Sequence, residues 1–221
     1  DGTLYISDAL IRGIYRLSKG KLEPFFGSDA FTSLRGIALS ADEQLLYISD
    51  YELGVHVLSI AQLRAIPMTA GDQNMGGVEG LYLHNNELMM LQTGTYPTRL
   101  QRVVLQNDGV TVKVSVPLEA NKPEFQEPTV GVVINSDLYY ITNSQLLGYG
   151  VDGKPIAGIK PQRRVIYRTP LNQPLPAAPP TPASLKNRMR QLQEQREKAA
   201  APANPDAAPK APEVVEQPPG Q

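Results

Sequence analysis

The sequence predicts an all-β protein of the β-propeller class, because one short β-type segment recurs along it. The segment is clearest at Leu45–Asp50 and returns at 3–8, 88–93 and 138–143. A second repeated signal is a glycine that opens a short apolar run before a copy, at Gly36, Gly80 and Gly131. Self-similarity at a period of about 40–50 residues, built from β-type segments, is typical of propeller blades.

The first repeat predicts an incomplete blade, with strands at 3–7, 12–17 and 21–26. Asp1-Gly2 has the composition of a hairpin turn, and the strand that should precede it is missing. We therefore expect a fragment or a processed chain, cut inside a repeat of a parent with about six blades. The alternative is a four-bladed ring closed by another segment.

The second repeat predicts a complete blade of four antiparallel strands, at 35–39, 45–49, 54–60 and 64–69. Polar turn formers at 40–43 separate its first two apolar runs. Residues 61–66 are ambiguous, because Ala61–Ala65 is equally compatible with a helical turn.

The third and fourth repeats predict a further blade each. The strands of the third are expected at 78–83, 87–92, 98–105 and 110–117. The strands of the fourth are expected at 129–134, 137–142, 146–150 and about 163–168. Their apolar runs are nearly continuous, which suits sheets packed on both faces, and their Tyr, Ile, Val and Thr content favours strands over helices.

The composition changes after Arg168, so the propeller is expected to span 1–168. A Pro-rich, extended linker is expected at 169–183, and a helix capped by Ser184 at 184–200. Residues 201–221, rich in Ala, Pro and Glu, are expected to be a disordered tail.

Composition excludes several classes of function. Lys and Arg number 21 and Asp and Glu 22, for a net charge of −1, which gives no electrostatic reason to expect nucleic acid as a partner. There is no cysteine, so disulfides and thiolate metal sites are excluded. No apolar run reaches the roughly 18–20 residues of a transmembrane segment. His56 and His84 are isolated and suggest neither a catalytic triad nor a zinc site.

The repeat places two sets of residues, most of them polar, on one rim of the propeller. In an antiparallel pair the start of one strand lies beside the end of the other. The residues just before the inner strands are Arg35, Glu79 and Val130. Those just after the second strands are Asp8, Asp50, Thr93 and Asn143. Both sets should meet at one mouth of the central channel, where ligand sites of such folds are usually found.

Glu79 is the leading candidate for chemistry at this mouth. Its carboxylate could bind a divalent cation, Ca²⁺ or Zn²⁺, together with Asp50 and Asn143, or act as a general base. The alternative is an ion pair with Arg35 of the neighbouring blade. For Asp50, Asn143 and Asp8 the alternative is structural, since such side chains accept hydrogen bonds from loop N–H groups and fix turns.

Three further residues are candidates for ligand contact. Arg35 could hold an anionic ligand through its guanidinium. Asn74, in the connector 71–77, and Tyr96, in the loop 93–97, open onto the same rim.

Residues Gly36–Asp50, with the pattern Gly-x-Ala-x-Ser-x-Asp-x-x-x-Leu-Tyr-Ile-Ser-Asp, resemble a blade of the senescence-marker-protein/gluconolactonase family. The pattern is also similar to NHL-repeat and strictosidine-synthase-like propellers, all six-bladed. The family resemblance implies hydrolysis of sugar lactones with one divalent cation, held by Glu, Asn and Asp at the channel mouth. Glu79 matches that ligand set, whereas Arg35 and Val130 stand where the family places Asn.

Two functions follow as hypotheses. The first is a non-catalytic propeller that binds a small molecule or a protein on its rim. The second is a divalent-cation-dependent lactone hydrolase. In a hydrolase Glu79 should lie beside further oxygen ligands, and in a binding module it should be neutralised by Arg35. By analogy with exported gluconolactonase-like proteins, a periplasmic or secreted location is expected.

Overall fold

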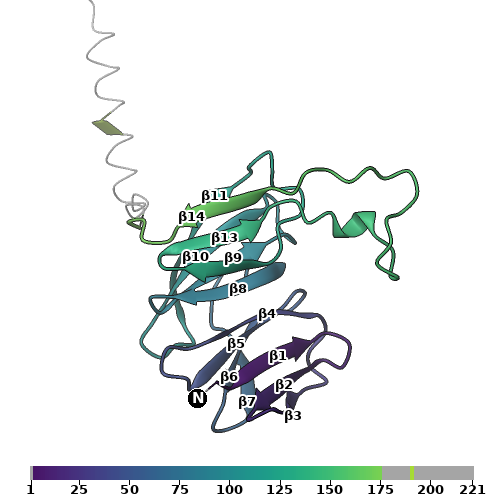
Figure 1. The fold of residues 1–221 in the computed structure, drawn as a ribbon. Helices are drawn as coiled ribbons and strands as arrows, with labels where there is room; N and C mark the ends of the chain where they lie inside the picture. Colours follow the sequence, from purple (N-terminus) through teal and green to yellow (C-terminus); the bar gives the residue numbers. More distant parts are fainter. Residues whose placement is uncertain (1, 176–189, 192–221) are drawn as a thin grey trace, which may run out of the picture. The chain divides into compact units, whose positions relative to one another are not determined.

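The computed structural model describes residues 2–175 together with 190 and 191 (Figure 1). The chain divides into two units, Asp1–Leu175 and Pro176–Gln221. In the second unit only Arg190 and Gln191 are described, and both are helical and exposed. The rest of the helix predicted at 184–200 and the tail predicted at 201–221 lie outside the described residues.

The first unit is an all-β protein built from four antiparallel sheets, as the repeats predicted. In every sheet the strands are hydrogen-bonded in chain order, so each sheet is an up-and-down meander. Strand β4 contacts β1 and β8, and β8 contacts β12. Successive sheets therefore pack side by side as the blades of a β-propeller. Among the described residues, no helix is long and apolar enough to cross a membrane.

The first blade has the three strands that were predicted. They are β1 (Leu4–Asp8), β2 (Gly13–Ser18) and β3 (Lys21–Gly27), in the order β1-β2-β3. The rings of Tyr5 and Phe25 lie 5.1 Å apart on the face that packs toward the second blade. One face of this sheet is thus covered.

The second blade is complete and resolves the ambiguity at 61–66. Its strands are β4 (Leu34–Leu39), β5 (Leu45–Asp50), β6 (Gly54–Ser59) and β7 (Arg64–Pro67). Strand β7 pairs with β6 over its whole length, so this segment is a strand after the turn that ends at Leu63, whose φ is 48°.

The third blade also has four strands. They are β8 (Val78–His84), β9 (Glu87–Gln92), β10 (Arg99–Leu105) and β11 (Val112–Ala120). The turn between β8 and β9 is made by two asparagines, 85 and 86, and both have the positive φ that Asn tolerates.

The fourth blade corrects one prediction. Its strands are β12 (Gly131–Ile134), β13 (Asp137–Ile141) and β14 (Ile166–Pro170). The strand predicted at 146–150 is wrong, since Leu146–Gly148 forms a 3₁₀ turn. The strand predicted near 163–168 is present as β14, which pairs directly with β13 and is therefore third, not fourth, in its sheet. Its end at Pro170 lies two residues beyond the expected end of the propeller.

Among residues 2–175, side chains between neighbouring blades form three apolar clusters, one at each junction. The junction of the second and third blades is the tightest. At Gly36 a Cβ atom would lie 2.5 Å from the Leu81 backbone nitrogen, so only glycine lets β4 approach β8 this closely. In both β5 and β9 five of the six residues are buried, as expected of strands covered on both faces.

Candidate functional site

The predicted rim is present at the junction of the second and third blades. In the register of these sheets Leu34 lies opposite Asp50, and Val78 lies opposite Gln92. The start of each inner strand therefore lies beside the end of its second strand. We call this end of the two blades, with the loops that leave from it, the rim.

Arg35 and Glu79 meet across the rim, which confirms the predicted ion pair. Arg35 Nε lies 3.3 Å from Glu79 Oε2. The side chains are 35% and 27% exposed, so both remain open to solvent on one side. Arg35 also donates through Nη1 to the carbonyl oxygen of Leu34, at 3.1 Å. The pair is thus fixed in place without being enclosed.

Tyr51 adds an aromatic surface that the sequence analysis did not single out. The Arg35 guanidinium carbon lies 5.7 Å from the centre of the Tyr51 ring, a distance at which a cation is attracted to the ring face. The Tyr51 hydroxyl and Thr93 Oγ1 share a hydrogen bond of 3.2 Å that links two blades. The sequence did contain a signal for Tyr51, since it directly follows Asp50 and so begins the loop after the second strand, on the rim.

The connector 71–77 is held onto the rim by a buried glutamine. Gln92 Nε2 donates to the carbonyl oxygens of Asn74 and Gly76, at 3.0 and 2.9 Å. Asn74 is exposed, and its Oδ1 accepts a hydrogen bond of 2.8 Å from the Gly76 N–H within its own loop. The connector is therefore fixed, with one polar side chain at its surface.

Tyr96 lies in the next rim loop and is 96% exposed. That loop packs closely on the connector, since a Cβ atom at Gly77 would lie 2.6 Å from the Gly94 Cα. The ring of Tyr96 is thus presented to solvent from a supported loop.

Asp50 is buried and acts on its own loops, as the structural alternative predicted. Its carboxylate accepts hydrogen bonds from the backbone N–H and the hydroxyl of Thr32, both at 2.6 Å. It also accepts three more backbone N–H groups, from Ser33, Glu52 and Leu53. Burial would raise the pKa of Asp50, but these hydrogen bonds outweigh burial and hold it below the ordinary value.

Asn143 and Asp8 also fix loops of their own blades, the fourth and the first, but through different partners. Asn143 Oδ1 accepts from the Val165 N–H at 2.7 Å, and its Nδ2 donates to the Arg163 carbonyl oxygen at 2.9 Å. Asp8 Oδ1 accepts from the N–H groups of Leu10 and Ile11, at 2.8 and 3.3 Å. The repeated polar residue therefore meets a repeated structural need.

A cation site is not assembled in this arrangement. Glu79 is paired with Arg35, and the oxygens of Asp50 and Asn143 are taken up by loop N–H groups. Within residues 2–175 and 190–191, no group of three His, Asp or Glu side chains could hold a metal ion. In this arrangement the three side chains are engaged by other groups, and their metal role stays a prediction.

The two histidines occupy structural positions. His56 is buried, with its ring 5.3 Å from that of Phe31. Burial lowers the pKa of His56, against the charge of Asp50, which raises it. His84 Nε2 shares a hydrogen bond with Asn172 Oδ1, at 3.1 Å.

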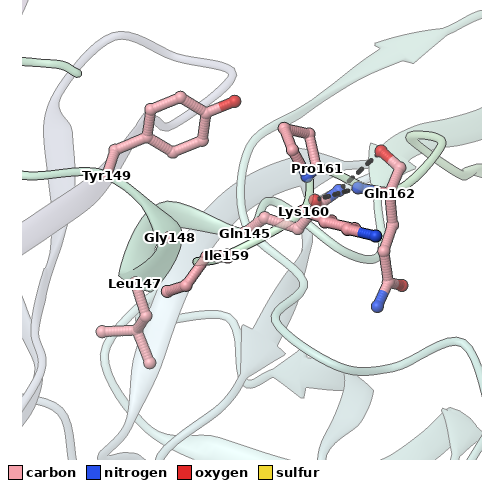
Figure 2. Close-up of a pocket in the computed structure, with 8 residues that line it drawn as sticks. All are labelled: Gln145, Leu147, Gly148, Tyr149, Ile159, Lys160, Pro161 and Gln162. Carbon is pink, nitrogen blue, oxygen red and sulfur yellow. Dashed lines mark hydrogen bonds between the residues drawn. The ribbon is translucent and has the colours of Figure 1, made fainter. Parts of the chain in front are cut away.

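A cavity of about 250 Å³ lies in the long connection between β13 and β14 (Figure 2). The residues that line it come from two short stretches, 145–149 and 159–162. No sequence signal predicted it, because a strand was expected over 146–150.

The comparisons with known proteins concern the fold alone. No family model and no curated protein matches the chain. It is similar to a solved structure of a nidogen/laminin complex, with 15% identity over 74% of this chain and 60% of that chain and a TM-score of 0.49. It is also similar to virginiamycin B lyase from Staphylococcus aureus, with 11% identity over 78% of this chain and 53% of that chain and a TM-score of 0.49. With a luciferin-regenerating enzyme the identity is 16% over 59% of this chain and 43% of that chain, and the TM-score is 0.42. The chain thus spans about half the length of these structures.

Proposed function

We propose that the chain is a non-catalytic β-propeller binding module that takes a small molecule or a protein segment on its rim. The contact surface would comprise Arg35, Tyr51, Asn74, Glu79 and Tyr96. The observation that supports the proposal most directly is the Arg35–Glu79 ion pair, with Arg35 stacked on an aromatic ring and both charges open to solvent.

This arrangement suits recognition better than proton transfer. A guanidinium beside an aromatic face can hold a carboxylate by hydrogen bonds while the ring packs on an apolar group. To act as a general base, Glu79 would have to leave the guanidinium with which it forms an ion pair. The rim therefore offers a ligand a positive group (Arg35), an aromatic ring (Tyr51) and a negative group (Glu79), whose relative positions are fixed.

The test is ligand screening by nuclear magnetic resonance on ¹⁵N-labelled protein, with amino acids and small carboxylates as probes. Binding should shift the amide signals of Arg35, Tyr51 and Glu79, and Arg35→Gln should abolish the shifts. Lys113→Glu, a change at an exposed residue of β11, is the matched control. Shifts that map away from the rim, or that persist in Arg35→Gln, would contradict the proposal.

The competing proposal is the divalent-cation-dependent lactone hydrolase. It requires Glu79 to leave Arg35 and bind Ca²⁺ or Zn²⁺. Calorimetric titration of each ion into the wild type and Glu79→Gln separates the two functions. Binding heat that depends on Glu79, together with hydrolysis of a sugar lactone, would favour the hydrolase over the binding module.

A further inference from the structure

The connection between β13 and β14 is far longer than its counterparts. β5 and β6 are joined by 51–53 and β9 and β10 by 93–98, whereas β13 and β14 are joined by 142–165. All three connections follow a second strand, so all three leave from the rim side of their blades. We call residues 145–164 the insertion.

The insertion has a defined shape that hydrogen bonds maintain. At its base the Gln162 N–H donates to Gln145 Oε1 at 2.7 Å, and Gln145 Nε2 donates to the Gln162 carbonyl oxygen at 3.0 Å (Figure 2). Further out, the Ile156 N–H donates to the Gly148 carbonyl oxygen at 2.9 Å. A surface of this kind is partly organised before any partner binds, which lowers the entropy cost of binding.

The insertion exposes an unusual number of large apolar side chains. Leu147 is 84% exposed, and single exposed residues of this type are common on protein surfaces. Here five lie within one short segment: Leu146, Leu147, Val151, Ile156 and Ile159. Exposed apolar residues gathered in this way are typical of contact surfaces.

The cavity in the insertion has the size of a side-chain pocket. Its walls include Leu147, Tyr149, Ile159 and Pro161, which are largely apolar (Figure 2). Its volume of about 250 Å³ is below the range of about 300–1,000 Å³ that is usual for small-molecule sites. The space therefore suits one or two apolar side chains of a peptide better than a complete metabolite.

The insertion is also positively charged, although the chain as a whole has a net charge of −1. It contains four cations and one carboxylate: Lys154, Lys160, Arg163, Arg164 and Asp152. Asp152 pairs with Lys154 at 3.5 Å, and the Arg164 guanidinium carbon lies 5.8 Å from the centre of the Tyr149 ring. Lys160 lines the cavity itself, so positive charge borders the apolar pocket.

We propose that the insertion is a docking arm for an acidic segment of a protein partner. One apolar side chain of that segment enters the cavity, and flanking carboxylates face Lys160 and the two arginines at the base. Charge complementarity would steer the encounter, and the apolar anchor would supply most of the affinity. The inference extends the proposed binding function but uses neither Arg35 nor Glu79, so the two can fail separately.

The test uses a fluorescein-labelled peptide with the sequence Glu-Glu-Leu-Phe-Glu-Glu and fluorescence polarisation on the full chain. We expect saturable binding with a Kd on the order of 100 µM. The affinity should fall severalfold between about 50 and about 300 mM salt, because salt screens exposed charges. Leu147→Asp and Lys160→Glu should each weaken binding about tenfold, and Lys113→Glu should leave it unchanged.

Several outcomes would overturn the proposal. One is the absence of saturable binding up to about 1 mM peptide. Another is a loss of peptide affinity in Lys113→Glu as large as in Lys160→Glu, which would show that the peptide is attracted by positive charge anywhere on the protein. A third is binding to phosphatidylserine vesicles that Leu147→Asp abolishes, in the absence of peptide binding. That result would mean that the insertion binds a membrane surface and not a protein. Loss of peptide binding in Arg35→Gln would move the site from the insertion to the rim.

Discussion

The second and the first blade contain the same β motif in different surroundings. In β5, Tyr47 and Ile48 are 1% and 0% exposed, because sheets cover both faces. In β1 the corresponding Tyr5 is half-buried and Ile6 is 42% exposed. The motif decides that the segment is a strand, whereas the neighbouring sheet decides how much the strand contributes to stability.

The same contrast holds at the other end of the described arc. Strand β12 has no buried residue, although its sequence is as apolar as that of the inner strands of the middle blades. Outside the insertion, the large apolar residues exposed in or beside the strands of the fourth blade are Val130, Val132, Ile134 and Ile166. Free energies of unfolding should therefore depend strongly on which copy of the repeat is changed.

The largest expected effect comes from shortening the same motif residue in the two blades. Ile48→Ala should lower the free energy of unfolding by about 3 kcal/mol, because it leaves a cavity in a packed junction. Ile6→Ala should cost about 1 kcal/mol or less, since Ile6 is partly in water already. Urea unfolding at pH 7, followed by circular dichroism, measures both. Equal losses would show that the first blade is covered as fully as the second.

The next effect concerns the closeness of the blades. Gly36→Ala should cost about 2 kcal/mol, because the new Cβ would lie 2.5 Å from the Leu81 nitrogen and β4 would have to move away from β8. Gly27→Ala, in β3, is the matched control, since a Cβ there meets no atom within 4 Å. Its effect should stay within about 0.5 kcal/mol. A neutral Gly36→Ala would mean that the junction is looser than described.

The comparison also shows where sequence reasoning succeeds and where it stops. Strand positions in the first three blades could be predicted from the repeat, because a strand found in one copy indicates a strand at the same position of the next copy. The fourth blade departs from the repeat, and the segment 146–150, expected to be a strand, begins with a 3₁₀ turn. Glycines at 148, 150 and 153 disfavour a strand in this segment. The next strand that pairs with β13 is therefore β14.

The rim was predictable in part for a related reason. Arg35 and Glu79 hold the same position, at the start of the inner strand, in two adjacent blades, so their meeting could be expected from the repeat. The stacking of Arg35 on Tyr51 could not, because it depends on how one loop turns after its strand. A structural role for Asp50 was one of the two alternatives. Its hydrogen bonds to Thr32 could not be predicted, because they depend on the conformation of the loop before β4.

Asp50 and Asp8 offer a third comparison at equivalent positions. Asp50 joins the loop before its inner strand to the loop after its second strand, whereas the described partners of Asp8 are two N–H groups in the loop after its strand. Asp50→Ala should cost about 2 kcal/mol, because it leaves several partly buried N–H groups without an acceptor. Asp8→Ala should cost about 0.5 kcal/mol. Thermal unfolding of both variants measures the difference, which would vanish if the loop before β4 were held by other contacts.

The stabilising effect of Asp50 should depend on pH. Its pKa in the folded protein lies below the ordinary value, so its contribution is complete above the unfolded pKa of about 3.9 and is lost as pH falls through the lower, folded pKa. The stability gap between the wild type and Asp50→Ala should therefore be constant from about pH 5 to 8 and narrow below about pH 4. A gap that persists unchanged at the lowest pH would show that the ionised form is not what stabilises the loops.

The smallest effect on stability is expected at the rim pair itself. Arg35 and Glu79 are partly exposed, so their coupling in a double-mutant cycle with Arg35→Gln and Glu79→Gln should be about 0.2–1 kcal/mol and should decrease with salt. These variants should therefore fold like the wild type. A rim ligand would nevertheless be lost in Arg35→Gln, because the guanidinium that faces it is gone. A coupling well above this range would mean that the pair serves to join the second and third blades, and that its exposure to ligands is incidental.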